Sequence, residues 1–291
     1  MLPKTLPALV KILTQTFPRA QAEREARWIA NELAEANWIA ACNKRAQHYP
    51  LQYILHTQPF GDLELLCKPN VLIPRLDTED WVLEAIETLK NGNVKLDRIL
   101  DYCTGSGCIA LSFASQFSSD TVIDCVDYSE DAVNLARENL TKNDSHIISE
   151  CNIHQGNLFE GYIPHDDEYR MPNTVNLLVS NPPYIPDCDL VEGEVELSVL
   201  KYEPRDALLG DLEFYDALCD NIIQKYPSFK GFICELGYME QAKRMAEKLP
   251  TNDWIVGIRN DHSGHIRNVL GWKRNSELGV LNTMVHSYLQ N

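Results

Sequence analysis

Apolar and polar residues follow two different patterns along this chain. From residue 7 to about residue 45, apolar residues recur at helical spacing, interrupted only by Pro18, which predicts a small helical domain. The run Leu63–Leu66 alternates instead, and Val71-Leu72-Ile73 is an apolar run. Two groups of turn residues, Phe60-Gly61-Asp62 and Lys68-Pro69-Asn70, flank these runs. We therefore expect a β-hairpin after the helical domain.

From Arg98 onward, short apolar runs alternate with segments of helical periodicity, which is the pattern of a doubly wound α/β sheet. The predicted strands lie near 98–102, 121–126, 148–154, 175–180, 230–235, 254–258 and 265–272, and the predicted helices near 107–117, 129–142, 212–225 and 238–248. Residues 160–174 are polar and are expected to form a surface loop. The residues after Lys273 carry no pattern that places them.

Length and charge narrow the possible functions. The chain has 291 residues, 44% of them hydrophobic, which is enough for one large domain and a smaller one. Its 26 basic and 42 acidic residues give a net charge of −16, which repels phosphate backbones and favours a basic partner. We expect a monomer that binds no nucleic acid directly and has no membrane span, since no apolar run approaches the roughly 18 residues that a span needs.

Cysteine usage and the N-terminal composition bear on location. The nine cysteines are scattered and never spaced as C-x-x-C, so they indicate neither a disulfide framework nor a zinc site, and a reducing compartment fits best. Residues 1–22 contain three basic residues and no acidic one, which is typical of a mitochondrial transit segment. An ordinary first helix has the same composition, so a cytoplasmic location is the alternative.

Residues 98–111 predict a strand, a glycine turn and the start of a helix. Gly105 and Gly107 permit positive φ and the close approach of a ligand, and the next helix presents free backbone N–H groups. The same geometry serves dinucleotides and phosphates, so the turn alone is a weak signal. The absence of a third glycine at Ala110 argues against a dinucleotide.

Two carboxylates stand at strand ends near this turn. Asp127 closes the second strand, about twenty residues beyond the glycines, where a carboxylate can accept both ribose hydroxyls. Asp101 ends the first strand, where a carboxylate can help hold the ammonium group of an amino-acid moiety. Both positions fit an adenosine cofactor, and strand-end capping is the plainer interpretation.

The predicted strand 175–180 runs directly into Asn181-Pro182-Pro183-Tyr184. Because the carboxyl ends of parallel strands lie on one edge of a sheet, this loop and the glycine turn should face the same crevice. An amide nitrogen is a poor nucleophile, so a methyl donor needs its N–H₂ group held at close range. The Asn181 side-chain oxygen and the Pro182 carbonyl can each accept one N–H bond, and Tyr184 can stack on the amide.

The loop alone does not identify the substrate. A glutamine amide and the amino groups of adenine and cytosine all present a planar N–H₂ group. A protein amide methyltransferase and a nucleic-acid amino methyltransferase both remain possible, as does a binding module that has kept the fold and lost catalysis. A turn that merely ends a strand is the structural alternative.

Several stretches resemble the HemK/PrmC family of peptide-chain release factor glutamine N5-methyltransferases, over nearly the whole chain. They are residues 50–54, 71–79, the glycine turn, 181–185, 203–208, and Glu235-Leu236-Gly237 with Gln241. The first two lie outside the generic methyltransferase fold, so they separate this family from nucleic-acid amino methyltransferases. The short N-terminal domain and residues 53–61 look most like the fungal mitochondrial branch.

The resemblance implies an α/β fold with three parts. They are a helical N-terminal substrate-recognition domain at 1–50, a β-hairpin linker at 51–78, and a Rossmann-like seven-stranded class I methyltransferase domain at 79–291. It also implies methyl transfer from S-adenosyl-L-methionine, with S-adenosyl-L-homocysteine as product. The implied acceptor is the glutamine of the Gly-Gly-Gln loop in a class I release factor of translation termination, and the branch favours mitochondria.

Residue chemistry and the resemblance together predict two sets of site residues and no metal ligand. The expected cofactor residues are Asp101, Cys103, Thr104, Gly105, Ser106, Gly107, Asp127, Leu158, which would border the adenine, and Asn181. The expected catalytic residues, which would hold the glutamine, are Asn181, Pro182, Pro183 and Tyr184.

The sequence departs from the family pattern at two positions. Cys103 stands where the family usually has glycine, so the turn there must be one that an L-residue tolerates. Asn157 replaces the usual aspartate, which removes a charge but keeps an acceptor. Arg75 and Glu79 are expected to form a structural ion pair, with a substrate-facing role as the alternative.

Overall fold

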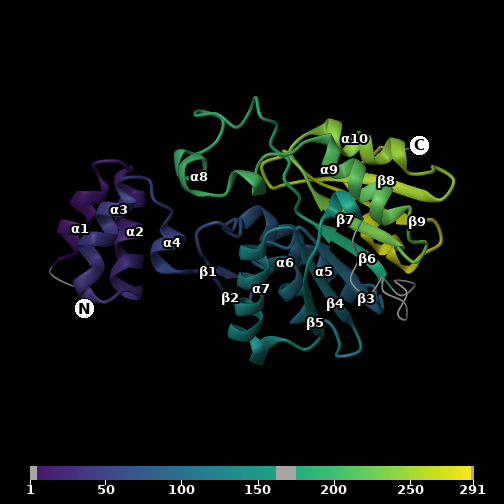
Figure 1. Cartoon of the computed structure of the whole chain (residues 1–291), viewed down its shortest axis with the longest axis horizontal. Coiled ribbons are helices and arrows are strands. Elements are labelled where there is room, and N and C mark those ends of the chain that lie inside the picture. Colours follow the sequence, from purple (N-terminus) through teal and green to yellow (C-terminus); the bar gives the residue numbers. More distant parts are fainter. Residues whose placement is uncertain (1–4, 162–174, 290–291) are drawn as a thin grey trace.

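The structure is a computed structural model that describes residues 5–161 and 175–289 (Figure 1). Four helices form its N-terminal part: α1 (Leu6–Leu13), α2 (Arg19–Glu32), α3 (Trp38–Arg45) and α4 (Leu51–Leu55). They surround a hydrophobic core of their own, separate from the cores of the sheet. Pro18 is the N-cap of α2, so it separates two helices. Inside the bundle, the buried Arg45 and Glu25 form an ion pair at 2.7 Å.

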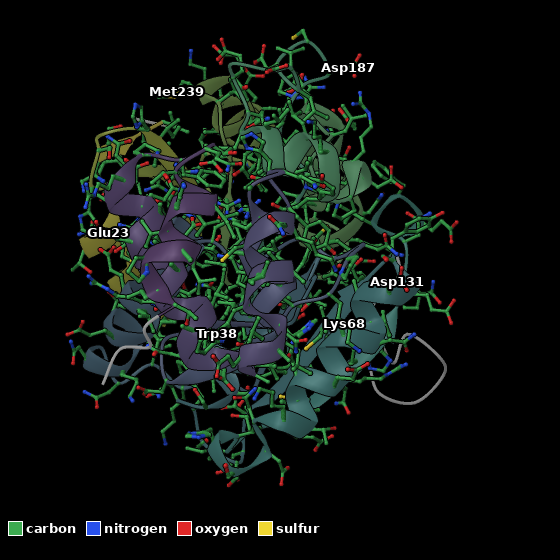
Figure 2. The ribbon with its side chains drawn as sticks, turned by 90° about the vertical axis from the view of Figure 1, so that its left-hand side faces the viewer. Glu23, Trp38, Lys68, Asp131, Asp187 and Met239 are labelled. Atoms are coloured by element: carbon green, nitrogen blue, oxygen red, sulfur yellow. The ribbon has the colours of Figure 1, made fainter. Side chains whose placement is uncertain are left out.

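A β-hairpin joins these helices to the rest of the chain. Strands β1 (Thr57–Phe60) and β2 (Leu63–Leu66) pair in antiparallel fashion and confirm a hairpin, whereas the apolar run 71–73 forms no strand. Asn139 of α7 (Glu130–Lys142) accepts a hydrogen bond from a backbone N–H of β2 at 2.6 Å, and Asn143 accepts another at 3.2 Å. These amides satisfy the edge of β2 in place of a further strand. Viewed from the N-terminal side, α1 to α3 lie in front of the sheet domain (Figure 2).

The central sheet has the strand order β10-β8-β9-β7-β6-β3-β4-β5. Its strands are β3 (Arg98–Tyr102), β4 (Val122–Asp127), β5 (Glu150–Gln155), β6 (Val175–Ser180), β7 (Gly231–Glu235), β8 (Trp254–Asn260), β9 (Ile266–Lys273) and β10 (Ser287–Tyr288). β3 to β7 run parallel, whereas β9 runs antiparallel to both β7 and β8. The strand order reverses between β3 and β6, and open α/β sheets bind ligands at such a point.

Helices cover both faces of the sheet (Figure 1). One face carries α5 (Leu76–Asn91), α6 (Cys108–Ala114) and α7, and the other carries α9 (Leu212–Ala217), the π-helix η5 (Leu218–Ile223) and α10 (Met239–Lys248). Strand residues alternate between the two layers: Ile99 packs into the first core and Leu100 into the second. Helix α8 (Leu197–Tyr202) lies in the connection between β6 and α9.

The predicted strands all occur, with ends within two residues of the expected ones. The tail after Lys273, for which the sequence offered no placement, forms the 3₁₀-helix η6 (Glu277–Met284) and the edge strand β10, so the sheet has one strand more than the expected seven. Most of the predicted loop 160–174 lies outside the described residues. No helix in the described ranges is long and apolar enough to cross a membrane.

Candidate active site

The glycine turn (residues 103–107) connects β3 to α6 and takes its shape from left-handed backbone. The angle φ is +62° at Cys103, +56° at Gly105 and +82° at Gly107. Glycine adopts these angles freely, whereas an L-residue there costs roughly 1 kcal/mol. Cys103 is therefore the strained residue of the turn. This strain is the structural consequence of a cysteine at a position where the family usually has glycine.

Asp127, at the end of β4, holds the turn from the side. Its Oδ2 accepts the Gly105 N–H at 2.8 Å, and its Oδ1 accepts the Ser129 N–H at 2.9 Å. Burial raises the pKa of Asp127, and these N–H bonds oppose that rise. The carboxylate thus stands at the strand end with both oxygens oriented by backbone groups.

Asp101 lies beneath the turn and is fully buried. Its Oδ2 accepts the Thr104 hydroxyl at 2.6 Å and the Ala110 N–H at 3.2 Å. Within the described residues, no group hydrogen-bonds its other oxygen, Oδ1. Burial is the main cause that raises the pKa of Asp101 to about 7.

The Asn-Pro-Pro-Tyr loop (residues 181–184) follows β6 and is held by groups far along the chain. The Tyr184 carbonyl accepts a hydrogen bond from Gln241 Nε2 at 2.9 Å. A Cβ at Gly210 would lie 2.3 Å from the Pro183 carbonyl oxygen, and one at Gly237 would lie 3.0 Å from the Tyr184 ring. Both glycines are therefore needed because the loop passes so closely.

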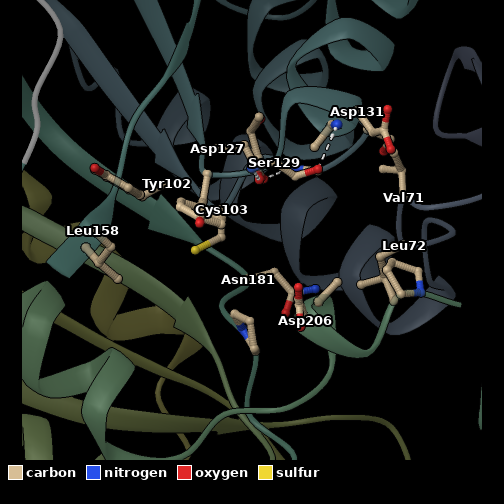
Figure 3. Close-up of a pocket in the computed structure, with 18 of the residues that line it drawn as sticks. Val71, Leu72, Tyr102, Cys103, Asp127, Ser129, Asp131, Leu158, Asn181 and Asp206 are labelled. Atoms are coloured by element: carbon tan, nitrogen blue, oxygen red, sulfur yellow. Dashed lines mark hydrogen bonds between the residues drawn. The ribbon is translucent and has the colours of Figure 1, made fainter.

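Both loops line one cavity of about 910 Å³ (Figure 3). Eight of the predicted site residues border it: Cys103, Thr104, Gly105, Ser106, Asp127, Leu158, Asn181 and Pro183. In the close-up, Cys103 lies between Asp127 and Asn181, with Leu158 to one side and Leu72 on the other. The expectation that the two loops share a crevice is confirmed.

A second cavity of about 370 Å³ also borders Asn181. It shares Leu72, Arg75, Asn181 and Ala207 with the first cavity and is also lined by Tyr184. Asn181 therefore faces both spaces.

Comparisons with known proteins agree with this architecture. Residues 77–194 match the family model described as the methyltransferase small domain. The chain is 35% identical, over 97% of its length and 89% of the relative, to the "Mitochondrial MRF1 N(5)-glutamine methyltransferase MTQ1" of Saccharomyces cerevisiae. It is 32% identical, over 94% of each chain, to the "Probable MRF1 mitochondrial N(5)-glutamine methyltransferase mtq1" of Schizosaccharomyces pombe. The chain belongs to the release factor glutamine methyltransferase family.

A bacterial relative and a solved structure extend the comparison. The "Release factor glutamine methyltransferase" of Geobacter sulfurreducens is 40% identical over 61% of this chain and 58% of its own. Among solved structures, the hMettl16 catalytic domain in complex with a MAT2A 3′UTR hairpin superposes with a TM-score of 0.51, at 15% identity, over 81% of this chain and 82% of that one. That likeness concerns the fold, which is the α/β fold of class I methyltransferases.

Four of the predicted site residues do not border the larger cavity of this family member. Asp101 lies beneath the glycine turn, Gly107 ends the turn at the N-cap of α6, Pro182 is buried, and Tyr184 lines only the second cavity. Asp101 thus contacts the turn through Thr104. A direct contact of Asp101 with a cofactor stays a prediction.

Several residues that line the larger cavity were not predicted as site residues. They are chiefly residues 70–75, Tyr128 to Ala132, Phe159, Asp206 and Phe214. One sequence signal could have found two of them, because Tyr128 and Phe159 are large aromatic residues that directly follow predicted site residues. The structure leaves both side chains exposed. Phe159 packs edge-on against Phe214, with ring centroids 5.1 Å apart.

Arg75 and Glu79 do not pair with one another. Arg75 Nη2 binds the buried Glu203 at 2.6 Å, while Glu79 accepts the Gly61 N–H at 2.9 Å. The expected ion pair is therefore wrong in its partners, because Glu203 arrives from a distant part of the chain. Asn157, the second departure from the family pattern, accepts the Phe159 N–H at 3.0 Å and caps the short 3₁₀ turn η3 (Leu158–Glu160).

Proposed function

We propose that this chain transfers a methyl group from S-adenosyl-L-methionine to the N5 side-chain amide of the glutamine in the Gly-Gly-Gln loop of a class I release factor. The observation that carries the proposal is the single cavity shared by the glycine turn and the Asn-Pro-Pro-Tyr loop. A cofactor site and an amide-holding loop within one cavity suit transfer between the two, and family membership names the acceptor.

The residues of the larger cavity fit an adenosine cofactor. A Cβ built on Gly105 meets nothing within 4 Å, so the turn leaves space for a ligand where a side chain would stand. Asp127 would accept the ribose hydroxyls, Leu158 would border the adenine, and Cys103 to Ser106 would lie against the amino-acid part. The Oδ1 of Asp101, which no group in the described residues hydrogen-bonds, lies beneath that end. When bound, S-adenosyl-L-methionine supplies an electrophilic methyl group on a sulfonium.

The Asn-Pro-Pro-Tyr loop would hold the acceptor amide. A glutamine entering through the second cavity reaches Asn181, which faces both spaces. The Asn181 Oδ1 and the Pro182 carbonyl would each accept one amide N–H, and Tyr184 would stack on the amide plane. In such a transfer the S–CH₃ bond of the sulfonium would break as the methyl carbon joins the glutamine nitrogen, leaving S-adenosyl-L-homocysteine. The nitrogen would lose one proton to water only after it had gained the methyl group, so no residue would have to remove a proton beforehand.

The remaining parts of the proposal concern domains, partner and location. The N-terminal domain would recognise the substrate; it reaches the second cavity through α8, where Tyr202 donates to the Gln47 carbonyl at 3.2 Å. The acidic chain would attract a basic partner. The mitochondrial names of two relatives and the basic residues 1–22 support a mitochondrial location, which imaging of a C-terminally tagged chain would test.

The function is tested with labelled S-adenosyl-L-methionine and a purified mitochondrial class I release factor. We expect one methyl group per release factor, located on the glutamine of Gly-Gly-Gln by mass spectrometry. A release factor with that glutamine changed to alanine serves as the matched control and should remain unlabelled. Equal labelling of both proteins, or labelling of RNA or DNA offered in their place, would refute the proposed acceptor.

A further inference from the structure

A buried chain of hydrogen bonds links helix α5 to Asn181. Trp81 Nε1 donates to Glu235 Oε2 at 2.9 Å, and the Thr78 hydroxyl donates to the same oxygen at 2.7 Å. Asn181 Nδ2 then donates to the Thr78 oxygen at 3.3 Å. Trp81, Thr78 and Glu235 are all at most 1% exposed, so water does not compete for these bonds.

The donors and acceptors in this series of hydrogen bonds can be arranged in only one way. An indole N–H can only donate, so Glu235 Oε2 accepts from Trp81. The Thr78 hydroxyl has a single proton, and it uses this proton in the hydrogen bond that it donates to the carboxylate oxygen. The Thr78 oxygen is left with acceptor capacity only, and it therefore selects the amino group of Asn181 as its partner.

This selection decides which end of the Asn181 amide is presented to a substrate. With Nδ2 turned to Thr78, Oδ1 is the end left to receive an N–H₂ group. A rotated amide would set Nδ2 against the amino group of the acceptor, and two donors cannot bond to each other. The orientation is thus as important as the residue type.

We infer that Thr78, oriented by Glu235, is a positioning residue that fixes the Asn181 amide with its oxygen toward the acceptor. The inference rests on the proposed function, because it assigns a task to Thr78, which borders the larger cavity beside Asn181, and to Glu235, which holds Thr78 from behind. It also gives a purpose to Glu235 of the Glu235-Leu236-Gly237 motif, which lies at the end of β7 and does not line either cavity. Tyr184 donates to the other oxygen, Glu235 Oε1, at 3.4 Å, so one carboxylate serves both residues of the loop.

The test is Thr78→Val, which keeps the shape of the side chain and removes the acceptor. We expect kcat for release factor methylation to fall about 10- to 100-fold, with little change in KM for the release factor or in cofactor affinity by calorimetry. Thr78→Ser restores the hydroxyl and should recover most of the wild-type kcat. Thr88→Val, the same change at a half-buried position later in α5, is the matched control and should leave kcat unchanged.

Three results would overturn the inference: a Thr78→Val enzyme with wild-type kcat, a Thr78→Ser enzyme as slow as Thr78→Val, or a loss confined to KM. If Thr78→Val does not fold, Thr78→Cys keeps a similar size with a much weaker acceptor and replaces it. Failure of the proposed function looks different, because then the wild type itself leaves the release factor unmethylated. A wild type and Thr78→Val that both methylate, beside an inactive Asn181→Ala, would remove only the positioning role.

Discussion

The glycine turn and the Asn-Pro-Pro-Tyr loop border the same cavity, but they obtain their shapes by opposite means. The turn is shaped by its own backbone, with positive φ at three of its five residues, 103–107. None of residues 181–184 has a positive φ. That loop is held from outside, by Gln241, by the space left at Gly210 and Gly237, and by the hydrogen-bond chain through Thr78.

The difference decides which kind of substitution damages each region. In the glycine turn, a new side chain meets a conformational cost even where there is room for it. Around the Asn-Pro-Pro-Tyr loop, backbone angles are ordinary and the cost arises from lost contacts or lost space. The five substitutions below test this division, from the largest expected effect to the smallest.

Asn181→Ala removes the side-chain oxygen with which the Asn-Pro-Pro-Tyr loop would accept a hydrogen bond from the substrate amide. We expect kcat for release factor methylation to fall about 100- to 1000-fold, because one preorganised hydrogen-bonding group at the reacting centre contributes that much. Cofactor affinity should fall far less, since the glycine turn is built independently. Turnover of the variant within a few-fold of wild type, measured with saturating release factor, would reject the assigned role of the loop.

Asp101→Asn tests the buried carboxyl beneath the glycine turn. Burial raises the pKa of Asp101 from 3.8 to about 7. Between these two pH values the folded chain therefore keeps a proton that the unfolded chain has already lost. The stability that Asp101 contributes is therefore complete below pH 3.8 and is lost as the pH rises through 7. We expect the unfolding free energy of Asp101→Asn, relative to wild type, to gain about 4 kcal/mol between pH 4 and 8.

Urea unfolding at a series of pH values measures this gain. Asp97→Asn, which neutralises an exposed carboxylate just before β3, is the control and should show no comparable trend. A difference between Asp101→Asn and wild type that stays constant with pH would show that Asp101 is ionised throughout.

Gly210→Ala tests the space around the Asn-Pro-Pro-Tyr loop. The new Cβ would stand 2.3 Å from the Pro183 carbonyl oxygen and 2.7 Å from the Phe214 ring, so the loop must move. We expect the unfolding free energy to fall by about 2 kcal/mol and kcat to fall about tenfold, with cofactor affinity nearly unchanged. In the control Gly279→Ala, the nearest atom is 3.8 Å away, and both quantities should stay at their wild-type values.

What could be predicted from the sequence follows the same division between the two regions. Gly105 and Gly107 indicate positive φ from the local sequence alone. The apolar runs at 98–102 and 175–180 predict the strands that precede the two loops. Asn181 is held by Thr78 of α5, and Thr78 is held in turn by Glu235 of β7, and no local pattern joins these residues. The pairing of Arg75 was wrong for the same reason, since Glu203 is 128 positions away.

Gly105→Ala tests backbone strain without a steric clash, whereas Gly210→Ala tests a steric clash. At Gly105 a Cβ meets nothing within 4 Å, but φ is +56°. We expect stability to fall by about 1 kcal/mol from conformational strain, and cofactor affinity to fall about fivefold because the turn is displaced. Gly264→Ala has φ of +84° and equal room in the β8–β9 connection, so it should lose similar stability without any change in cofactor affinity. Equal affinity losses in both variants would contradict a local cause.

Cys103→Gly should have the smallest effect, because two terms oppose one another. At φ of +62°, glycine removes roughly 1 kcal/mol of strain, but it also gives the unfolded chain more freedom, a cost of about 0.4 to 1 kcal/mol. We expect the unfolding free energy to change by less than about 1 kcal/mol and cofactor affinity to stay within about threefold of wild type. Cys103→Ala keeps the strain and removes only the thiol, so it isolates the contribution of sulfur. If both variants lose cofactor affinity equally, the sulfur itself contacts the cofactor, and the turn would then depend on a side chain as the Asn-Pro-Pro-Tyr loop does.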